Sequence, residues 1–105
     1  MTLTRSFKET VMARIEQDEE FRHALFREGI DCLLTGDVDT GKAILRDYIN
    51  ATIGFENLSE ATNTPSKSLM RMFSQKGNPL AKNLFAVISH LQTHSGIHFE
   101  VRSVK

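Results

Sequence analysis

Residues 36–43, GDVDTGKA, have the spacing of a phosphate-binding loop: two glycines separated by four residues, then a lysine. Such a loop also needs a buried strand before the first glycine and a Ser or Thr hydroxyl for Mg²⁺ after the lysine. Here the preceding segment, FRHALFREGIDCLL, has helical spacing and position 43 is alanine, and Asp37 and Asp39 would repel phosphate. We therefore expect no nucleotide: Gly36 ends one helix, and Asp37 or Asp39 caps the next.

His90 and His94 lie four residues apart, and His98 follows. Two histidines at this spacing can bind zinc from one helix face. No H-E-x-x-H glutamate accompanies them, and no fourth ligand is apparent. The alternative is that these histidines are solvated or half-buried, and we expect neither a metal nor a cofactor.

The single cysteine, Cys32, lies in the apolar run DCLL. It can form no intramolecular disulfide, which fits a reducing compartment, and we expect a buried structural thiol. No general base is evident beside it and no serine occurs in G-x-S-x-G, so we expect no enzyme.

No apolar stretch approaches the ~18–20 residues of a membrane span. The first residues, MTLTRSFKET, lack the apolar region of a signal peptide. These features predict a cytoplasmic protein with no membrane contact.

Charge is balanced overall but divided unevenly along the chain. The 105 residues carry 13 Lys/Arg and 13 Asp/Glu, and 40% are hydrophobic, which suits one domain with a modest core. Residues 1–53 hold 7 basic and 10 acidic residues, a net of −3, and residues 54–105 hold 6 and 3, a net of +3. The second half is therefore the better candidate for an anionic partner.

The most informative stretch is residues 54–80, GFENLSEATNTPSKSLMRMFSQKGNPL, which reads as helix, tight turn, helix. Leu58 and the small Ala61 are expected to face inward on the first helix. Asn63 tolerates the left-handed conformation of the turn, and Thr64 is expected to cap the second helix with Pro65 at its first position.

The second of these helices, over about residues 65–74, divides into two faces. Leu69, Met72 and Phe73 are spaced to face the core. The outer face then carries Ser66, Lys67, Met70 and Arg71. Short polar and basic side chains near the N-terminal end of a helix suit the major groove of DNA.

This segment resembles the DNA-binding half of the Cro/repressor-type helix-turn-helix family. More narrowly, it is similar to the antidote (antitoxin) proteins of bacterial addiction modules, over about residues 54–95. The residues that carry the resemblance are Leu58, Glu60, Thr62, Pro65, Leu69, Arg71, Phe73, Ser74 and Gly77-Asn78-Pro79. Asn63 replaces the usual turn glycine, and Ser66 stands where many relatives have Arg or Gln, so the base preference cannot be read.

The resemblance implies a sequence-specific DNA-binding regulator that represses its own operon as a homodimer, with double-stranded operator DNA as partner. An antitoxin would also bind a small basic toxin. We expect Ser66, Lys67 and Arg71 to reach base edges. Phosphate contacts are expected from Thr64, Lys76, Asn78 and Lys82. The alternative is a protein-interaction module that binds a partner through acidic N-terminal helices.

The expected fold is all-α, with five or six helices including a helix-turn-helix, and a short C-terminal β-strand. Residues 1–53 form an N-terminal helical extension that packs on the domain, residues 54–95 the DNA-binding region, and residues 96–105 the strand. The helices are expected at about residues 4–17, 18–36, 37–51, 55–62, 65–74 and 79–93.

Period-two alternation predicts the strand, since Ile97, Phe99 and Val101 alternate with polar residues. A lone strand needs a partner. A second chain running antiparallel would provide one and make the segment a dimerisation element. The alternatives are a frayed tail or packing against its own domain.

Overall fold

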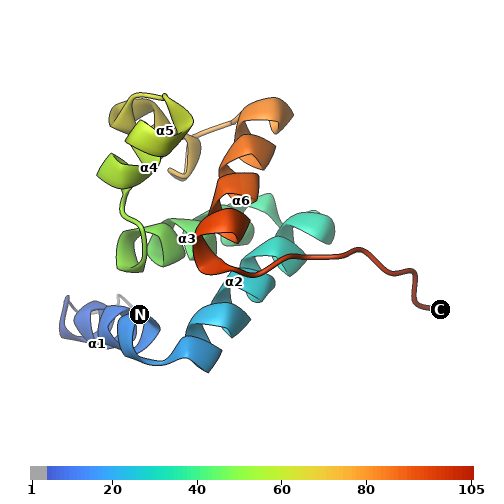
Figure 1. The fold of residues 1–105 in the computed structure, drawn as a ribbon, viewed down its shortest axis with the longest axis horizontal. Helices are drawn as coiled ribbons and strands as arrows, with labels where there is room; N and C mark the ends of the chain where they lie inside the picture. The colour runs from blue at the N-terminus through green and yellow to red at the C-terminus, as the bar shows by residue number, and fades with distance from the viewer. Residues whose placement is uncertain (1–4) are drawn as a thin grey trace.

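The computed structural model describes residues 5–105, and within them the chain forms six helices and no strand (Figure 1). The expected all-α class is confirmed. The first helix was expected to begin at residue 4, which lies outside the described residues. The helices are α1 (Arg5–Gln17), α2 (Glu19–Leu34), α3 (Val38–Ala51), α4 (Phe55–Thr62), α5 (Ser66–Met72) and α6 (Ala81–Ser95).

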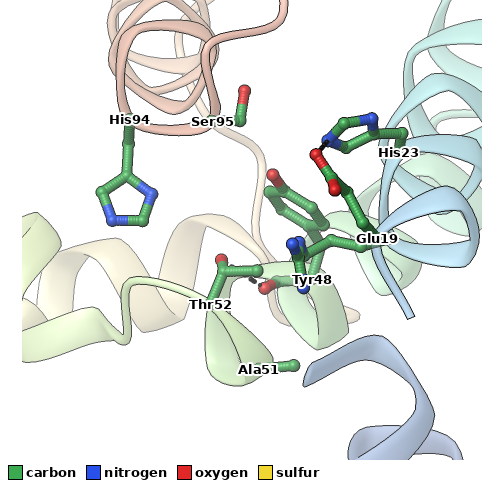
Figure 2. Close-up of a pocket in the computed structure, with 8 residues that line it drawn as sticks. Glu19, His23, Tyr48, Ala51, Thr52, His94 and Ser95 are labelled. Atoms are coloured by element: carbon green, nitrogen blue, oxygen red, sulfur yellow. Dashed lines mark hydrogen bonds and ion pairs between the residues drawn. The ribbon is translucent and has the colours of Figure 1, made fainter. Parts of the chain in front are cut away.

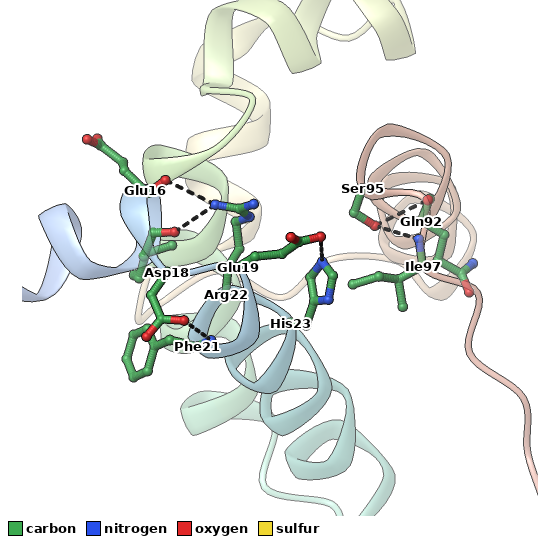
Figure 3. A network of polar contacts seen from close by, with 10 residues as sticks. Glu16, Asp18, Glu19, Phe21, Arg22, His23, Gln92, Ser95 and Ile97 are labelled. Atoms are coloured by element: carbon green, nitrogen blue, oxygen red, sulfur yellow. Dashed lines mark hydrogen bonds and ion pairs between the residues drawn. The ribbon is translucent and has the colours of Figure 1, made fainter.

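The junction between α1 and α2 is fixed by polar groups within a few residues of it (Figure 3). The Asp18 carboxylate accepts the backbone N–H of Phe21 at 3.1 Å, which caps the N-terminus of α2. Arg22 donates from Nη1 to the backbone oxygens of Ile15 and Glu16, both at 3.1 Å. These two carbonyls belong to the last turn of α1, where no helical donors remain. These bonds therefore stabilise the sharp change of direction between α1 and α2.

Helices α2 and α3 make the most extensive contact between elements. Gly36, at φ 91°, ends α2, and Asp37 caps α3 by accepting the N–H of Thr40 at 3.4 Å, as predicted. A Cβ on Gly41 would lie 2.8 Å from Cδ2 of Leu33. The second glycine of GDVDTGKA thus permits close helix packing and does not face a phosphate.

The core draws residues from both halves of the chain. Its buried members include Phe26, Leu45, Tyr48 and Ile49 from α2 and α3. From α4 to α6 come Phe55, Leu58, Leu69, Phe73, Val87 and Leu91. In Figure 1, α4 and α5 lie at the opposite end of the molecule from α1, with α3 between them.

The C-terminal strand was predicted wrongly. Residues 96–105 have no regular structure, because no other segment of the described chain lies alongside to pair with them. Ile97 and Phe99 instead pack against the core, with the Phe99 ring edge-on to Phe26. The N–H of Ile97 donates to Ser95 Oγ and that of Phe99 to Gln92 Oε1. The segment thus binds its own domain as far as residue 99, whereas Val101 is 85% exposed.

Candidate nucleic-acid interface

Helices α4 and α5 are joined by a turn of three residues, Asn63, Thr64 and Pro65. Asn63 adopts the left-handed conformation, with φ 51° and ψ 44°, as predicted. The N–H of Thr64 donates to Ser59 O at 3.1 Å, and Ser59 Oγ donates to Thr64 O at 2.6 Å. These bonds fix the direction in which α5 leaves the turn.

Two details of this turn differ from expectation. Thr64 does not cap α5, because its hydroxyl donates to Thr62 O at 3.1 Å and Pro65 is the residue at the N-cap. Ala61 is exposed, so the close approach of the two helices does not depend on it. Leu58, the other residue expected to face inward, is fully buried in the core.

The two faces of α5 follow the expected division. Leu69 and Phe73 are buried, and Met72 packs partly against the core. Lys67, Ser68, Met70 and Arg71 are exposed, and Ser66 is half-buried. Met70 is a large apolar side chain that is 47% exposed on an otherwise polar face. This face thus offers cations, a hydroxyl and one apolar group.

The loop after α5 folds back onto the C-terminal end of that helix. The N–H and Oγ of Ser74 both donate to Arg71 O, at 3.1 and 2.7 Å. The N–H of Gly77 donates to Ser74 O at 3.1 Å. Gly77 does not adopt a positive φ. Glycine is needed because a Cβ there would collide with the backbone oxygen of Arg71.

The structure brings together three of the seven predicted DNA-contacting residues. Arg71, Lys76 and Asn78 line one shallow hollow with Ser68, Gly77 and Pro79. Lys67 and Lys82 are exposed but lie outside this hollow, as do the half-buried Thr64 and Ser66. The N-terminus of α6 was expected at Pro79. It lies at Ala81, because residues 77–80 belong to the loop that wraps the end of α5.

No acidic residue occurs between Glu60 and Glu100. This interval contains α5, the loop and α6, and its charged residues are Lys67, Arg71, Lys76 and Lys82, besides the histidines. The interval itself therefore carries a net positive charge, which attracts a polyanion over several ångströms. One carboxylate from elsewhere lies beside the loop, because the exposed Asp39 of α3 shares a hollow with Ser74 and Gln75.

Lys42 is a residue of this region that the sequence prediction missed. It is only 3% exposed, and its Nζ donates to the backbone oxygens of Ser74 and Gly77 at 3.1 and 2.6 Å. A signal was present in the sequence, because Lys42 lies on the same face of α3 as Leu45 and Ile49, at positions i, i+3 and i+7. A lysine in an apolar stripe is expected to have buried acceptors.

A second hollow, of about 240 Å³, lies between α2, α3 and α6 (Figure 2). Its lining includes Arg22, His23, Tyr48 and His94. Burial raises the pKa of the Tyr48 phenol, an effect partly offset by Ser95 and by the charge of Arg22. The phenol therefore stays protonated at neutral pH and offers a hydrogen bond, not a nucleophile. His23 lies 3.7 Å from Glu19, so a carboxylate already faces the imidazole.

Cys32 is half-exposed, where a buried thiol was expected. Its Sγ lies 3.9 Å from Glu28 Oε1. Partial desolvation and the charges of Glu28, Asp37 and Asp31 raise the pKa of the thiol above its usual value. A protonated thiol is a poor nucleophile.

Among residues 5–105, no three His, Cys, Asp or Glu side chains lie close enough to hold a metal ion. In the same part of the chain, no helix combines the length and hydrophobicity needed to cross a bilayer.

Comparison of the chain with protein-family models, with curated proteins and with solved structures found no match. Function therefore has to be argued from the surface formed by α5 and the loop after it.

Proposed function

We propose that this protein is a sequence-specific DNA-binding regulator of transcription rather than an enzyme. In this proposal α4 and α5 form a helix-turn-helix, and α5 enters the major groove. The observation that carries the proposal is the cation-bearing outer face of α5 next to the hollow formed by Arg71, Lys76 and Asn78. The absence of carboxylates between Glu60 and Glu100 supports it further.

The candidate residues are assigned to two kinds of DNA contact, according to whether they lie on α5 or in other segments. Ser66, Lys67 and Arg71 are on α5 and are assigned to base edges, with Arg71 suited to a bidentate bond to guanine. Lys76, Asn78 and Lys82 follow α5 and are assigned to phosphates, which set the register of the protein on DNA. Thr64 is also assigned to a phosphate, although its hydroxyl would have to give up its bond to Thr62 O.

A titration with promoter DNA tests the proposal. The probe is a labelled duplex from directly upstream of this gene, compared with a scrambled duplex of equal length. We expect tighter binding to the promoter duplex than to the scrambled one. We also expect the logarithm of the binding constant to fall linearly with the logarithm of the salt concentration between about 50 and 200 mM. Equal, undetectable binding to both duplexes at low salt would refute DNA binding.

We further propose an antitoxin-like role, in which the regulator represses its own operon and also binds a small basic toxin. The net charge of −3 over residues 1–53 suits such a partner. The neighbouring reading frame tests this directly. A small basic protein of the ribosome-dependent ribonuclease type encoded next to this gene would support the antitoxin role, and its absence would leave a plain regulator.

A protein-interaction module is the second candidate. It is favoured by a groove of about 820 Å³ between α1 and α3, lined by Phe7, Lys8, Val11, Met12, Ala43, Arg46, Asp47 and Asn50. Phe7 is 53% exposed there. This candidate becomes the main one if promoter DNA does not bind.

A further inference from the structure

Lys42 is the lysine of the GDVDTGKA motif, and neither nucleotide binding nor the proposed DNA contacts account for it. It lies in the first half of α3, and its side chain is almost entirely buried. A lysine pays a large desolvation cost on burial unless its ammonium group finds acceptors.

The acceptors come from the loop after α5. Nζ lies 2.6 Å from Gly77 O and 3.1 Å from Ser74 O, bonds that join residues 35 and 32 positions apart in the chain. Asp39 Oδ1 is 3.7 Å away, but the Asp39 side chain is 84% exposed and contributes less. The ammonium group therefore bridges two turns of the loop at once.

These bonds determine where the loop presents its side chains. Lys76 and Asn78 flank Gly77, whose oxygen accepts the shorter bond. At the other end, Ser74 is bonded to Arg71 O. The relative placement of Arg71, Lys76 and Asn78 thus depends on a loop fastened to α5 on one side and to Lys42 on the other.

We propose that Lys42 is a positioning residue for DNA binding: its ammonium group fixes the 74–78 loop so that Lys76 and Asn78 meet phosphates while Arg71 meets a base. This inference rests on the proposed DNA-binding function. It also gives residues 1–53 a role in DNA binding without direct contact.

The first test measures the loop itself, without DNA. Lys42→Met keeps an unbranched side chain one atom shorter than lysine and removes the donors. We expect hydrogen exchange at the amides of Ser74 and Gly77 to accelerate about tenfold or more, with the α2 and α3 amides unchanged. Arg27→Met is the control, because Arg27 is an exposed cation on α2 that lines none of the hollows described above. Unchanged exchange at the loop amides would overturn the positioning role.

The second test is a double-mutant cycle on the promoter duplex. Lys42→Met should weaken binding by about tenfold in the wild type, but by less than about threefold when Lys76 is already alanine. A purely structural role would give equal losses in both backgrounds. Equal losses would therefore overturn the proposal, as would a loss no larger than that of Arg27→Met.

If Lys42→Met lowers the melting temperature of the whole protein, Gly77→Ala replaces it as the test variant. This substitution displaces the loop from the side that faces Arg71. Its Cβ would collide with Arg71 O while Lys42 stays intact. Gly77→Ala should also weaken DNA binding less when Lys76 is already alanine. Equal losses of affinity in the two backgrounds would refute the proposal. If the wild type binds no DNA, the proposed function fails and the DNA part of this inference with it. Faster loop exchange in Lys42→Met would still assign the loop-fixing role.

Discussion

At the scale of single residues, Arg71 and Lys76 are close together but are assigned to different parts of DNA. Arg71→Ala should cost about 1–3 kcal/mol of binding free energy and relax specificity at one base pair. Lys76→Ala should weaken binding to all sequences alike and lower the salt slope by about 1. Titrations of both variants against single-base operator variants at several salt concentrations measure these effects. If both bound the promoter duplex like the wild type, the assignment of the interface would be wrong.

Cys32 should react slowly with thiol reagents at neutral pH despite its partial exposure. Partial desolvation and neighbouring acids raise its pKa, so at pH 7 the thiolate fraction is smaller than for an ordinary cysteine. The alkylation rate with iodoacetamide should therefore rise to its plateau at higher pH than that of glutathione. Glu28→Gln removes one of the raising charges and should shift the profile to lower pH. A profile matching free glutathione would contradict this.

At the scale of elements, substitutions at Asn63 test whether the turn between α4 and α5 depends on the left-handed backbone conformation of this residue. Asn63→Gly should leave the free energy of unfolding nearly unchanged, because glycine adopts this conformation without strain. Asn63→Val should lower it by about 1–2 kcal/mol, since a β-branched residue is strained there. Urea unfolding followed by circular dichroism compares the two variants. Equal stabilities would show that the turn rearranges at no cost.

The elements were predictable wherever their ends are set by local chemistry. Asp37 caps the helix that follows it and Gly36 ends a helix at positive φ, as the sequence indicated. Asp18 and Gly96 act in the same way at α2 and α6. These signals act over three or four residues, so they can be read from the chain. The inward and outward faces of α5 were predictable for the same reason.

The wrong predictions concern features that depend on contacts between residues far apart in the sequence. The start of α6 was predicted at Pro79 and lies at Ala81. The loop before it is held at Ser74 and Gly77 by Lys42, more than thirty positions earlier in the chain. Lys42 itself was considered only as a phosphate ligand. Its place in the apolar stripe with Leu45 and Ile49 indicates burial, but the sequence does not show that the acceptors come from Ser74 and Gly77. The strand was predicted from alternation alone, but alternation does not state whether a partner strand exists.

At the scale of the whole molecule, one copy offers a single α5, so the proposed binding to DNA would give it few base contacts. Helix-turn-helix proteins commonly bind as dimers to two half-sites about one turn of DNA apart. Residues 100–105 are exposed and have no regular structure, and Val101 and Val104 are 85% and 89% exposed. We propose that this exposed segment contacts a second copy of the chain and that burial of the two valines contributes to a dimer.

Truncation after Phe99 tests this dimer without disturbing the core, because Ile97 and Phe99 keep their contacts with the domain. We expect the full chain to sediment as a dimer at micromolar concentration and the truncated chain as a monomer, with similar melting temperatures. Because each monomer would hold only one half-site, the truncated protein should also bind a two-site operator much more weakly than the full chain. Val101→Asp in the full chain is the matched variant. It should separate the copies as truncation does, because it puts a charge at a side chain that the dimer would bury. A truncated protein that remained dimeric would place the interface elsewhere on the molecule, and a monomeric full chain would exclude this pairing.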